Sequence, residues 1–176
     1  MGETPKWRCL ADIEHQLTQM QIIALSDQGS LTRQIRLSCE ATFDVHLISS
    51  AEVAPNAQEV CLLQLDKKIK VISRKVYLRC HKIPQIFAKT IIGLSSENQT
   101  FTDKIKALGE QSLGSILFKD PLARKQAVGF AQLSAQDAFF EDAFSENLNS
   151  YYWVRRNLYD YEGVSLIVYE AFLSEE

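Results

Sequence analysis

Hydrophobic and polar residues alternate along several stretches of the chain, a pattern typical of β-strands with one buried face. The alternation predicts strands at residues 41–50, 71–82, 85–94 and 125–133. Near the C-terminus, residues 150–159 and 164–173 alternate in the same way, and residues 160–163 end in the turn-forming residue Gly163. These two stretches predict a β-hairpin.

Other stretches carry the spacing of helices. Apolar residues between 13 and 25 form an imperfect helical stripe that ends at residues 26–29, and Ser30 can cap a second short helix with Leu31 on its apolar side. A third helix is predicted from Thr102 to Gly109. A fourth should begin at residues 134–137 and carry Phe139, Phe140 and Phe144. The first two form a helix-turn-helix arrangement, for which an ordinary helical hairpin on the core is favoured over DNA recognition.

The order of these elements indicates the fold class. Strands joined by hairpin connections, with helices before and between them, favour an antiparallel α+β domain over repeated βαβ units. The chain of 176 residues is long enough to bury a core, so a single domain over residues 1–176 is expected.

Composition and charge narrow the range of functions. Hydrophobic residues make up 46% of the chain and charged residues 23%, and 19 Lys and Arg against 22 Asp and Glu give a formal net charge of -3. No global positive field favours nucleic acid. A local basic run at residues 67–70 and 74–75 is interpreted as the solvated face of a strand. The first residues lack an apolar signal segment, so no stable membrane insertion is expected.

The cysteines and glycines exclude two common kinds of site. Cys9, Cys39, Cys61 and Cys80 lie far apart without a CxxC pair, so no metal site is predicted. They are interpreted as free thiols of a reduced, cytoplasmic protein. The glycines lack the spacing of a phosphate-binding loop, so no nucleotide cofactor is predicted.

Two charged residues stand out as candidates for chemistry. Glu170 shares one face of the last predicted strand with four apolar residues, where a buried carboxyl could act as an acid. The alternatives are that it turns to solvent or pairs with a core arginine, and one of Arg155 and Arg156 could point inward. Arg79 lies in the middle of a predicted strand, where it could bind an anion or pair with a surface carboxylate.

Six short motifs occur in an order that resembles the bacterial chorismate lyase family. They lie at residues 30–32 (SLT), 77–79 (YLR), 89–92 (KTII), 113–118 (LGSILF), 153–156 (WVRR) and 169–173 (YEAFL). The resemblance runs from about Met20 to Leu173. The chain departs from the family pattern at Cys80, Lys89 and Gly93, and its segment of residues 134–150 is longer.

The resemblance implies both a fold and an activity. The family fold is a six-stranded antiparallel sheet with helices on one side and helical flaps over a buried pocket. The implied reaction converts chorismate to 4-hydroxybenzoate and pyruvate without a cofactor, as the first step toward ubiquinone. By the same resemblance Arg79 binds the ring carboxylate with help from the Leu113 backbone, Glu170 meets the hydroxyl end of the ring, and Leu31 covers the ligand. Arg79 and Glu170 are the predicted catalytic residues, and a monomer is expected.

A second function stays open on the same fold. A related domain serves as an effector-binding sensor in transcription regulators, and a stand-alone protein that binds an aromatic acid without turnover would carry the same motifs. The sensor proteins also carry a winged-helix domain, for which this chain leaves no room. The enzyme is therefore the favoured hypothesis.

Overall fold

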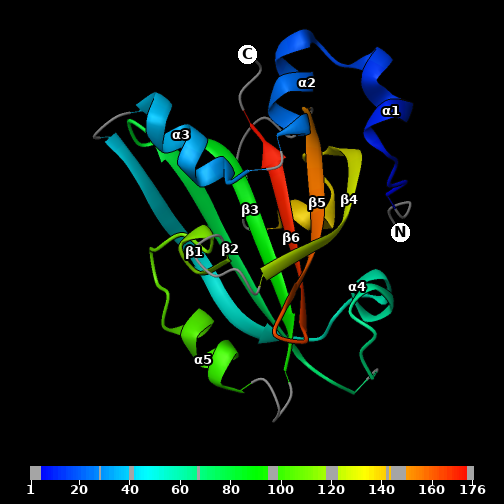
Figure 1. The fold of residues 1–176 in the computed structure, drawn as a ribbon, viewed down its shortest axis with the longest axis vertical. Coiled ribbons are helices and arrows are strands. Elements are labelled where there is room, and N and C mark those ends of the chain that lie inside the picture. Colours follow the sequence, from blue (N-terminus) through cyan, green and yellow to red (C-terminus); the bar gives the residue numbers. More distant parts are fainter. Residues whose placement is uncertain are drawn as a thin grey trace.

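The computed structural model shows a six-stranded antiparallel sheet with helices packed on it (Figure 1). The structure describes residues 5–27, 29–39, 42–66, 68–94, 99–117, 123–141, 143 and 150–173. The strand order is β1-β2-β3-β6-β5-β4, and every neighbouring pair is antiparallel. The predicted α+β fold class is confirmed.

The strands are β1 (Phe43–Val53), β2 (Val71–Cys80), β3 (Ile83–Gly93), β4 (Ala123–Ser134), β5 (Tyr151–Tyr161) and β6 (Val164–Phe172). Every stretch predicted as a strand is thus confirmed, with ends that differ by a few residues. The C-terminal hairpin turns through Glu162 and Gly163, whose φ angles are 51° and 83°. Two successive positive φ angles match the twist of a two-residue hairpin turn, and glycine adopts the second without strain.

The helices are α1 (Leu10–Ile13), η1 (Glu14–Gln16), α2 (Gln19–Ser26), α3 (Leu31–Cys39), α4 (Ala57–Leu62), α5 (Gln99–Lys106), α6 (Gly114–Leu117) and η4 (Ala138–Phe140). None of the helices in the described ranges is long and apolar enough to cross a membrane. The helix predicted at residues 13–25 is broken in two because Thr18 starts a new helix. Its hydroxyl accepts from the Gln21 backbone and its own N–H donates to the Gln21 side chain.

The sheet buries both of its faces. Even-numbered residues of β3 and β6 pack with Leu31 of α3 and with α5 and α6, where Ile92, Leu166 and Ile105 are fully buried. Odd-numbered residues such as Phe87 and Ile167 form the other core with α4 and η4. The alternation along the strands therefore divides two apolar layers, one on each face of the sheet.

The described part of the Phe-rich segment after β4 begins with a 3-10 turn where a longer helix is predicted. Asp137 caps this turn, Ala138–Phe140, by accepting a hydrogen bond from the Phe139 backbone at 2.8 Å. Phe139 and Phe140 turn inward and contact Phe87 edge-on or tilted. Their aromatic packing, rather than a regular helix, fixes this segment on the sheet; Phe144 lies outside the described residues.

The prediction of four free thiols is wrong. Cys39 at the end of α3 and Cys80 at the end of β2 form a disulfide, with their Cα atoms 5.5 Å apart. The two residues are separated by 41 positions in sequence, and only the packing of α3 on the sheet brings them together. Cys9 and Cys61 are free and exposed.

We expect the Cys39→Ser variant to lose about 3–4 kcal/mol of unfolding free energy, because the disulfide closes a long loop in the unfolded chain. Urea unfolding followed by tryptophan fluorescence measures the loss, and Cys61→Ser, which removes an exposed free thiol, is the control. Titration of the denatured wild-type protein with a thiol reagent should find Cys9 and Cys61 only. Reaction of all four cysteines would show that the bond does not form.

Candidate active site

A small closed cavity lies between the sheet and the segments that cover it. Its floor includes Arg74, Thr90, Tyr159 and Glu170 from four neighbouring strands, and its roof is formed by residues 30–32 and 112–114. The open space is about 40 Å³, room for only about three water molecules. A ring-sized ligand therefore requires the roof to move outward.

Arg74 is a buried cation at one end of this cavity. Its side chain comes from β2, is 2% exposed, and donates through Nη2 to the carbonyls of Gly109 (2.8 Å) and Gln111 (2.7 Å). Its Nε has no hydrogen-bond partner, and within the described residues Arg74 forms no ion pair. Burial lowers the pKa of Arg74 to about 10, so the group is still charged at neutral pH. A buried charge without an acidic partner is costly, so Arg74 is a candidate binding group for an anion.

Glu170 lies at the other end of the cavity and is already neutralised. Its Oε2 accepts from Arg155 Nε and from Asn157 Nδ2, both at 2.8 Å. Of the alternatives considered for Glu170, pairing with a core arginine is the one found, and Arg155 is the inward-facing arginine, at 1% exposure. No described residue donates to Oε1, so this oxygen can meet a ligand.

The sheet register sets the distance between these two ends. Arg74 pairs with Thr90, which pairs with Val168, whereas Glu170 pairs with Ala88. Arg74 and Glu170 are therefore two strands apart and displaced by two residues along the strands, on one face. Normal strand spacing and rise place their Cα atoms about 12 Å apart, so the two side chains reach the cavity from opposite ends.

Tyr159 adds a neutral hydroxyl to the cavity wall. Burial raises the pKa of its phenol well above the usual range, and the charge of Glu170 acts in the same direction. The phenol therefore stays protonated at any ordinary pH. With Thr90 and Ser112 it gives the cavity polar groups without further charge.

Leu31, the predicted covering residue, and Leu113, whose backbone N–H is predicted to assist the carboxylate, both line the cavity from above. Leu31, the first residue of α3, is 5% exposed and packs on Val76 and Leu78 of β2. Leu113 stands directly before α6 and packs in the core formed by Leu117 and Val168. The structure thus brings three of the predicted site residues, Leu31, Leu113 and Glu170, around one cavity.

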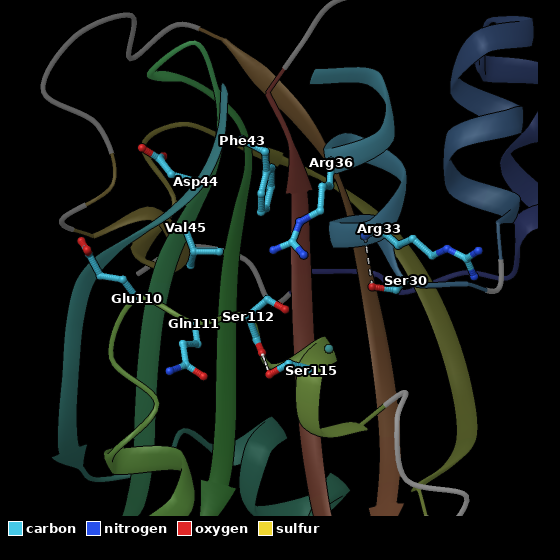
Figure 2. Close-up of a pocket in the computed structure, with 11 residues that line it drawn as sticks. Ser30, Arg33, Arg36, Phe43, Asp44, Val45, Glu110, Gln111, Ser112 and Ser115 are labelled. Atoms are coloured by element: carbon cyan, nitrogen blue, oxygen red, sulfur yellow. Dashed lines mark hydrogen bonds between the residues drawn. The ribbon is translucent and has the colours of Figure 1, made fainter. Parts of the chain in front are cut away.

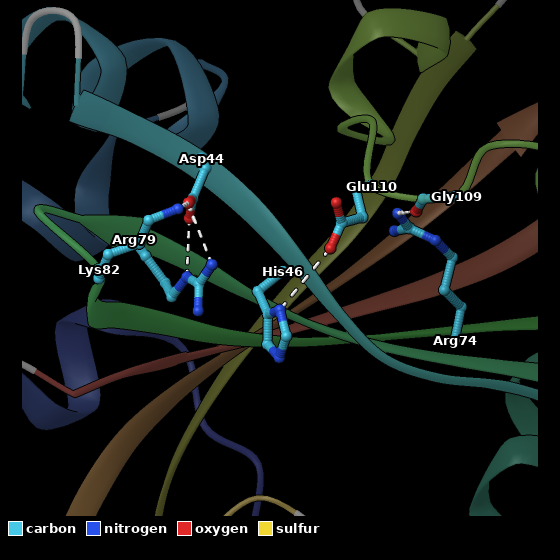
Figure 3. Close-up of polar contacts among 7 residues, drawn as sticks. All are labelled: Asp44, His46, Arg74, Arg79, Lys82, Gly109 and Glu110. Carbon is cyan, nitrogen blue, oxygen red and sulfur yellow. Dashed lines mark hydrogen bonds and ion pairs between the residues drawn. The ribbon is translucent and has the colours of Figure 1, made fainter.

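Arg79 does not line this cavity. Figure 3 shows it in a separate group, where its Nε donates to Asp44 Oδ1 at 2.7 Å, while Arg74 reaches Gly109. Hydrogen bonds from Arg79 and Lys82 lower the pKa of Asp44 to about 2. Of the two possibilities for Arg79, anion binding and pairing with a surface carboxylate, the structure shows the pair. Such a pair contributes little to stability.

The interpretation of Arg74 as part of a solvated basic face is wrong. The alternation that places Val76 and Leu78 on the buried face of β2 also places Arg74 there, because all three positions are even. Arg79 has the opposite parity. The alternation of β2 therefore predicts from the sequence that Arg74 is buried, but the lysines near it favour the interpretation as a solvated basic face.

A wider cleft of about 600 Å³ opens outside the cavity (Figure 2). It lies between α3 and residues 110–115 and shares Ser30, Ser112 and Gly114 with the cavity lining. Arg36 lies against the Phe43 ring at 5.3 Å on one wall. The cleft therefore leads from solvent to the roof of the cavity.

Comparisons with known proteins agree with these observations. The family model described as chorismate lyase matches residues 3–176. A probable chorismate pyruvate-lyase of Nitrosomonas europaea is 32% identical over 151 residues, covering 85% of this chain and 84% of that protein. A probable chorismate pyruvate-lyase of Methylococcus capsulatus is 30% identical over 149 residues, covering 84% and 90%.

Solved structures show the same fold at much lower identity. The effector domain of PhnF from Mycobacterium smegmatis superposes with a TM-score of 0.63 at 12% identity, covering 83% of this chain and 89% of that one. The ligand-binding domain of a putative GntR-family regulator from Bordetella bronchiseptica gives a TM-score of 0.56 at 8% identity, covering 77% and 88%. These likenesses concern the architecture of the sheet and helices alone.

Replacing Glu170 by leucine should destabilise the ligand-free protein by about 3–5 kcal/mol, because Arg155 would keep a buried charge without a partner. Glu170→Gln keeps an acceptor for Arg155 and should cost less. Urea unfolding measures both, with the exposed Glu162→Gln as the matched control. A loss below 1 kcal/mol for the leucine variant would contradict the buried pair.

Proposed function

This chain belongs to the chorismate lyase family, and from that premise we propose that it converts chorismate to 4-hydroxybenzoate and pyruvate in the cavity between Arg74 and Glu170. The observation that carries the proposal is that Arg74 forms no ion pair with any residue in the described ranges. Chorismate and 4-hydroxybenzoate both carry a ring carboxylate. A carboxylate accepts charge-assisted hydrogen bonds from a guanidinium, and Arg74 has its Nε unused.

The role expected of Arg79 therefore passes to Arg74 in this proposal. Arg74 binds the ring carboxylate, and the backbone N–H of Leu113, at the edge of the same cavity, assists it. Arg79 stays outside, held by Asp44. A protein with a net charge of -3 attracts an anionic substrate only through local positive charge of this kind.

Glu170 meets the opposite end of the ring. Its Oε1 accepts a hydrogen bond from the ring hydroxyl, because Oε2 is already occupied by Arg155 and Asn157. An acid role for Glu170 requires the proton to lie on Oε1 and stays a prediction. Leu31 closes over the bound ring and excludes water.

The reaction is an elimination that needs mainly positioning. The ring loses a hydrogen as a proton from the hydroxyl-bearing carbon, and the neighbouring carbon–oxygen bond breaks with its electron pair on the departing enolpyruvyl oxygen. The ring becomes aromatic, which drives the step, and the enolpyruvate takes up a proton and becomes pyruvate. Fixed contacts at both ends of the ring hold chorismate in the geometry for this step.

The family resemblance supports proposals for the pathway, the oligomeric state and the location of the protein. We propose that the product enters ubiquinone synthesis and that the protein works as a monomer in the cytoplasm. The Cys39–Cys80 disulfide is unusual for a reducing compartment, so the state of these two thiols in freshly lysed cells is informative about the location.

The first test is to incubate the purified protein with chorismate, without metal or nucleotide, while following pyruvate release and identifying the aromatic acid by chromatography. We expect pyruvate and 4-hydroxybenzoate in equal amounts. Saturable binding of 4-hydroxybenzoate without pyruvate release would indicate a non-catalytic binding protein on the same fold. The absence of both activities would overturn the proposal.

The affinity for 4-hydroxybenzoate distinguishes the role of Arg74 from that of Arg79. We expect Arg74→Gln to weaken binding about 10- to 100-fold, since a charge-assisted hydrogen bond contributes about 1.5–3 kcal/mol. Arg79→Gln, the matched control on the same strand, should stay within about threefold of wild type because Arg79 lies outside the cavity and pairs with the surface carboxylate of Asp44. Calorimetric titration measures both affinities. A larger loss for Arg79→Gln would return the carboxylate-binding role to that residue.

A further inference from the structure

Arg155 on β5 contacts both Glu170, which lines the cavity, and the end of α2, which leads into the helix above the cavity. It is the largest fully buried side chain among the described residues, and its Nε donates to Glu170 Oε2 at 2.8 Å. Its Nη1 points the other way along the same plane and donates to the backbone carbonyls of Leu25 (3.4 Å) and Asp27. These two carbonyls stand at the C-terminal end of α2.

Asp27 in turn contacts the start of α3; α2 and α3 together are called the cover below. The Asp27 carboxylate accepts from the Gly29 backbone N–H at 2.5 Å and from the side-chain amide of Gln34 on α3. The same helix begins with Leu31, which closes the cavity. One guanidinium therefore joins Glu170 to the helix that carries the roof of the site.

The geometry of a guanidinium makes this connection stiff. Its N–H donors lie in one plane at fixed angles, so Nε and Nη1 move together. A displacement of α2 and α3 away from the sheet therefore turns the donor that holds Glu170. A lysine at the same place offers one flexible ammonium, which cannot keep this planar two-sided contact.

We propose that Arg155 is a positioning residue that couples the orientation of Glu170 to the closure of α2 and α3 over the cavity. Since the open space in the cavity is about 40 Å³ and residues 30–32, at the start of α3, form part of its roof, a displacement of α3 makes room for a ring to enter or leave. Arg155 thus sets how often the site opens, without itself lining the cavity. The ligand-binding part of this inference rests on the proposed function.

The first experiment needs no ligand. Amide hydrogen exchange of ligand-free Arg155→Lys should be at least tenfold faster than wild type at Arg33 and Gln34, whose N–H groups bond to Ser30 in the cover. Arg156→Lys is the matched control, because that neighbour packs on the Trp7 ring on the other face of the sheet. Equal exchange in wild type and Arg155→Lys would overturn the coupling.

The second experiment measures ligand entry and exit. Stopped-flow binding of 4-hydroxybenzoate to Arg155→Lys should show association and dissociation rate constants that both rise at least fivefold. The loss of the Glu170 contact alone would raise only the dissociation rate constant, so the association rate constant is the decisive readout. An unchanged association rate constant would overturn the inference.

A second variant keeps the test independent of the buried arginine. Gln34→Leu removes the contact of α3 with Asp27 and touches neither the cavity nor Glu170. Like Arg155→Lys, it should raise the association rate constant. The double variant should raise this rate constant by less than the product of the two single effects, because both substitutions break the same connection. Full additivity would overturn the coupling.

The two proposals fail in different ways. If wild type does not bind 4-hydroxybenzoate, the proposed function is wrong, while the exchange rates of the ligand-free protein still decide whether Arg155 holds the cover. If wild type binds and both variants keep wild-type rate constants, the inference about Arg155 is wrong and the proposed function stands.

Discussion

A buried guanidinium that has no counter-ion in the part of the chain the structure describes is the constraint on which the rest of this structure depends. Arg74 is 2% exposed, and its protein partners are the carbonyls of Gly109 and Gln111. Two neutral acceptors satisfy part of its donor capacity and leave the charge uncompensated. The turn after α5 is wrapped around this side chain, which places Ser112 and Leu113 over the sheet. The buried Arg74 therefore both fixes this part of the roof and provides the candidate anion site.

The antiparallel sheet fixes the distance between the two ends of the cavity, Arg74 and Glu170. Side chains at even positions of β2, β3 and β6 point to one face, and the register places Arg74 and Glu170 on that face across β3. The central strands are paired on both sides, so their backbone cannot shift without breaking several ladders. The segments above the cavity are short helices and turns. The Cys39–Cys80 disulfide anchors the C-terminal end of α3, whereas the residues of α3 that cover the cavity lie at its other end. The site thus combines a rigid floor with a roof that can move.

Much of this fold is predictable from local pattern, because alternation records which face of a strand is buried. The same alternation predicts that Glu170 lies among apolar neighbours and, applied to Arg74, that this arginine faces the same layer. The resemblance to the family instead points to Arg79, the last residue of the YLR motif, and local pattern does not report that Asp44 pairs with it across the strands. The Cys39–Cys80 bond and the contact of Arg155 with α2 join segments far apart in sequence. Such contacts depend on the packing of helices on the sheet, which no local pattern determines.

The two ends of the cavity differ in a way that determines how a ligand is oriented. Both hold a charged side chain, but Glu170 is neutralised by Arg155, whereas Arg74 has no acidic partner among the described residues. A carboxylate gains from Arg74 and gains nothing from Glu170, where it would meet a second negative group. A hydroxyl can donate to the open oxygen of Glu170 and would leave the charge of Arg74 uncompensated. An aromatic acid with a hydroxyl opposite its carboxylate therefore has one favourable orientation, and the ion pair that neutralises Glu170 is as necessary for this as the missing partner of Arg74.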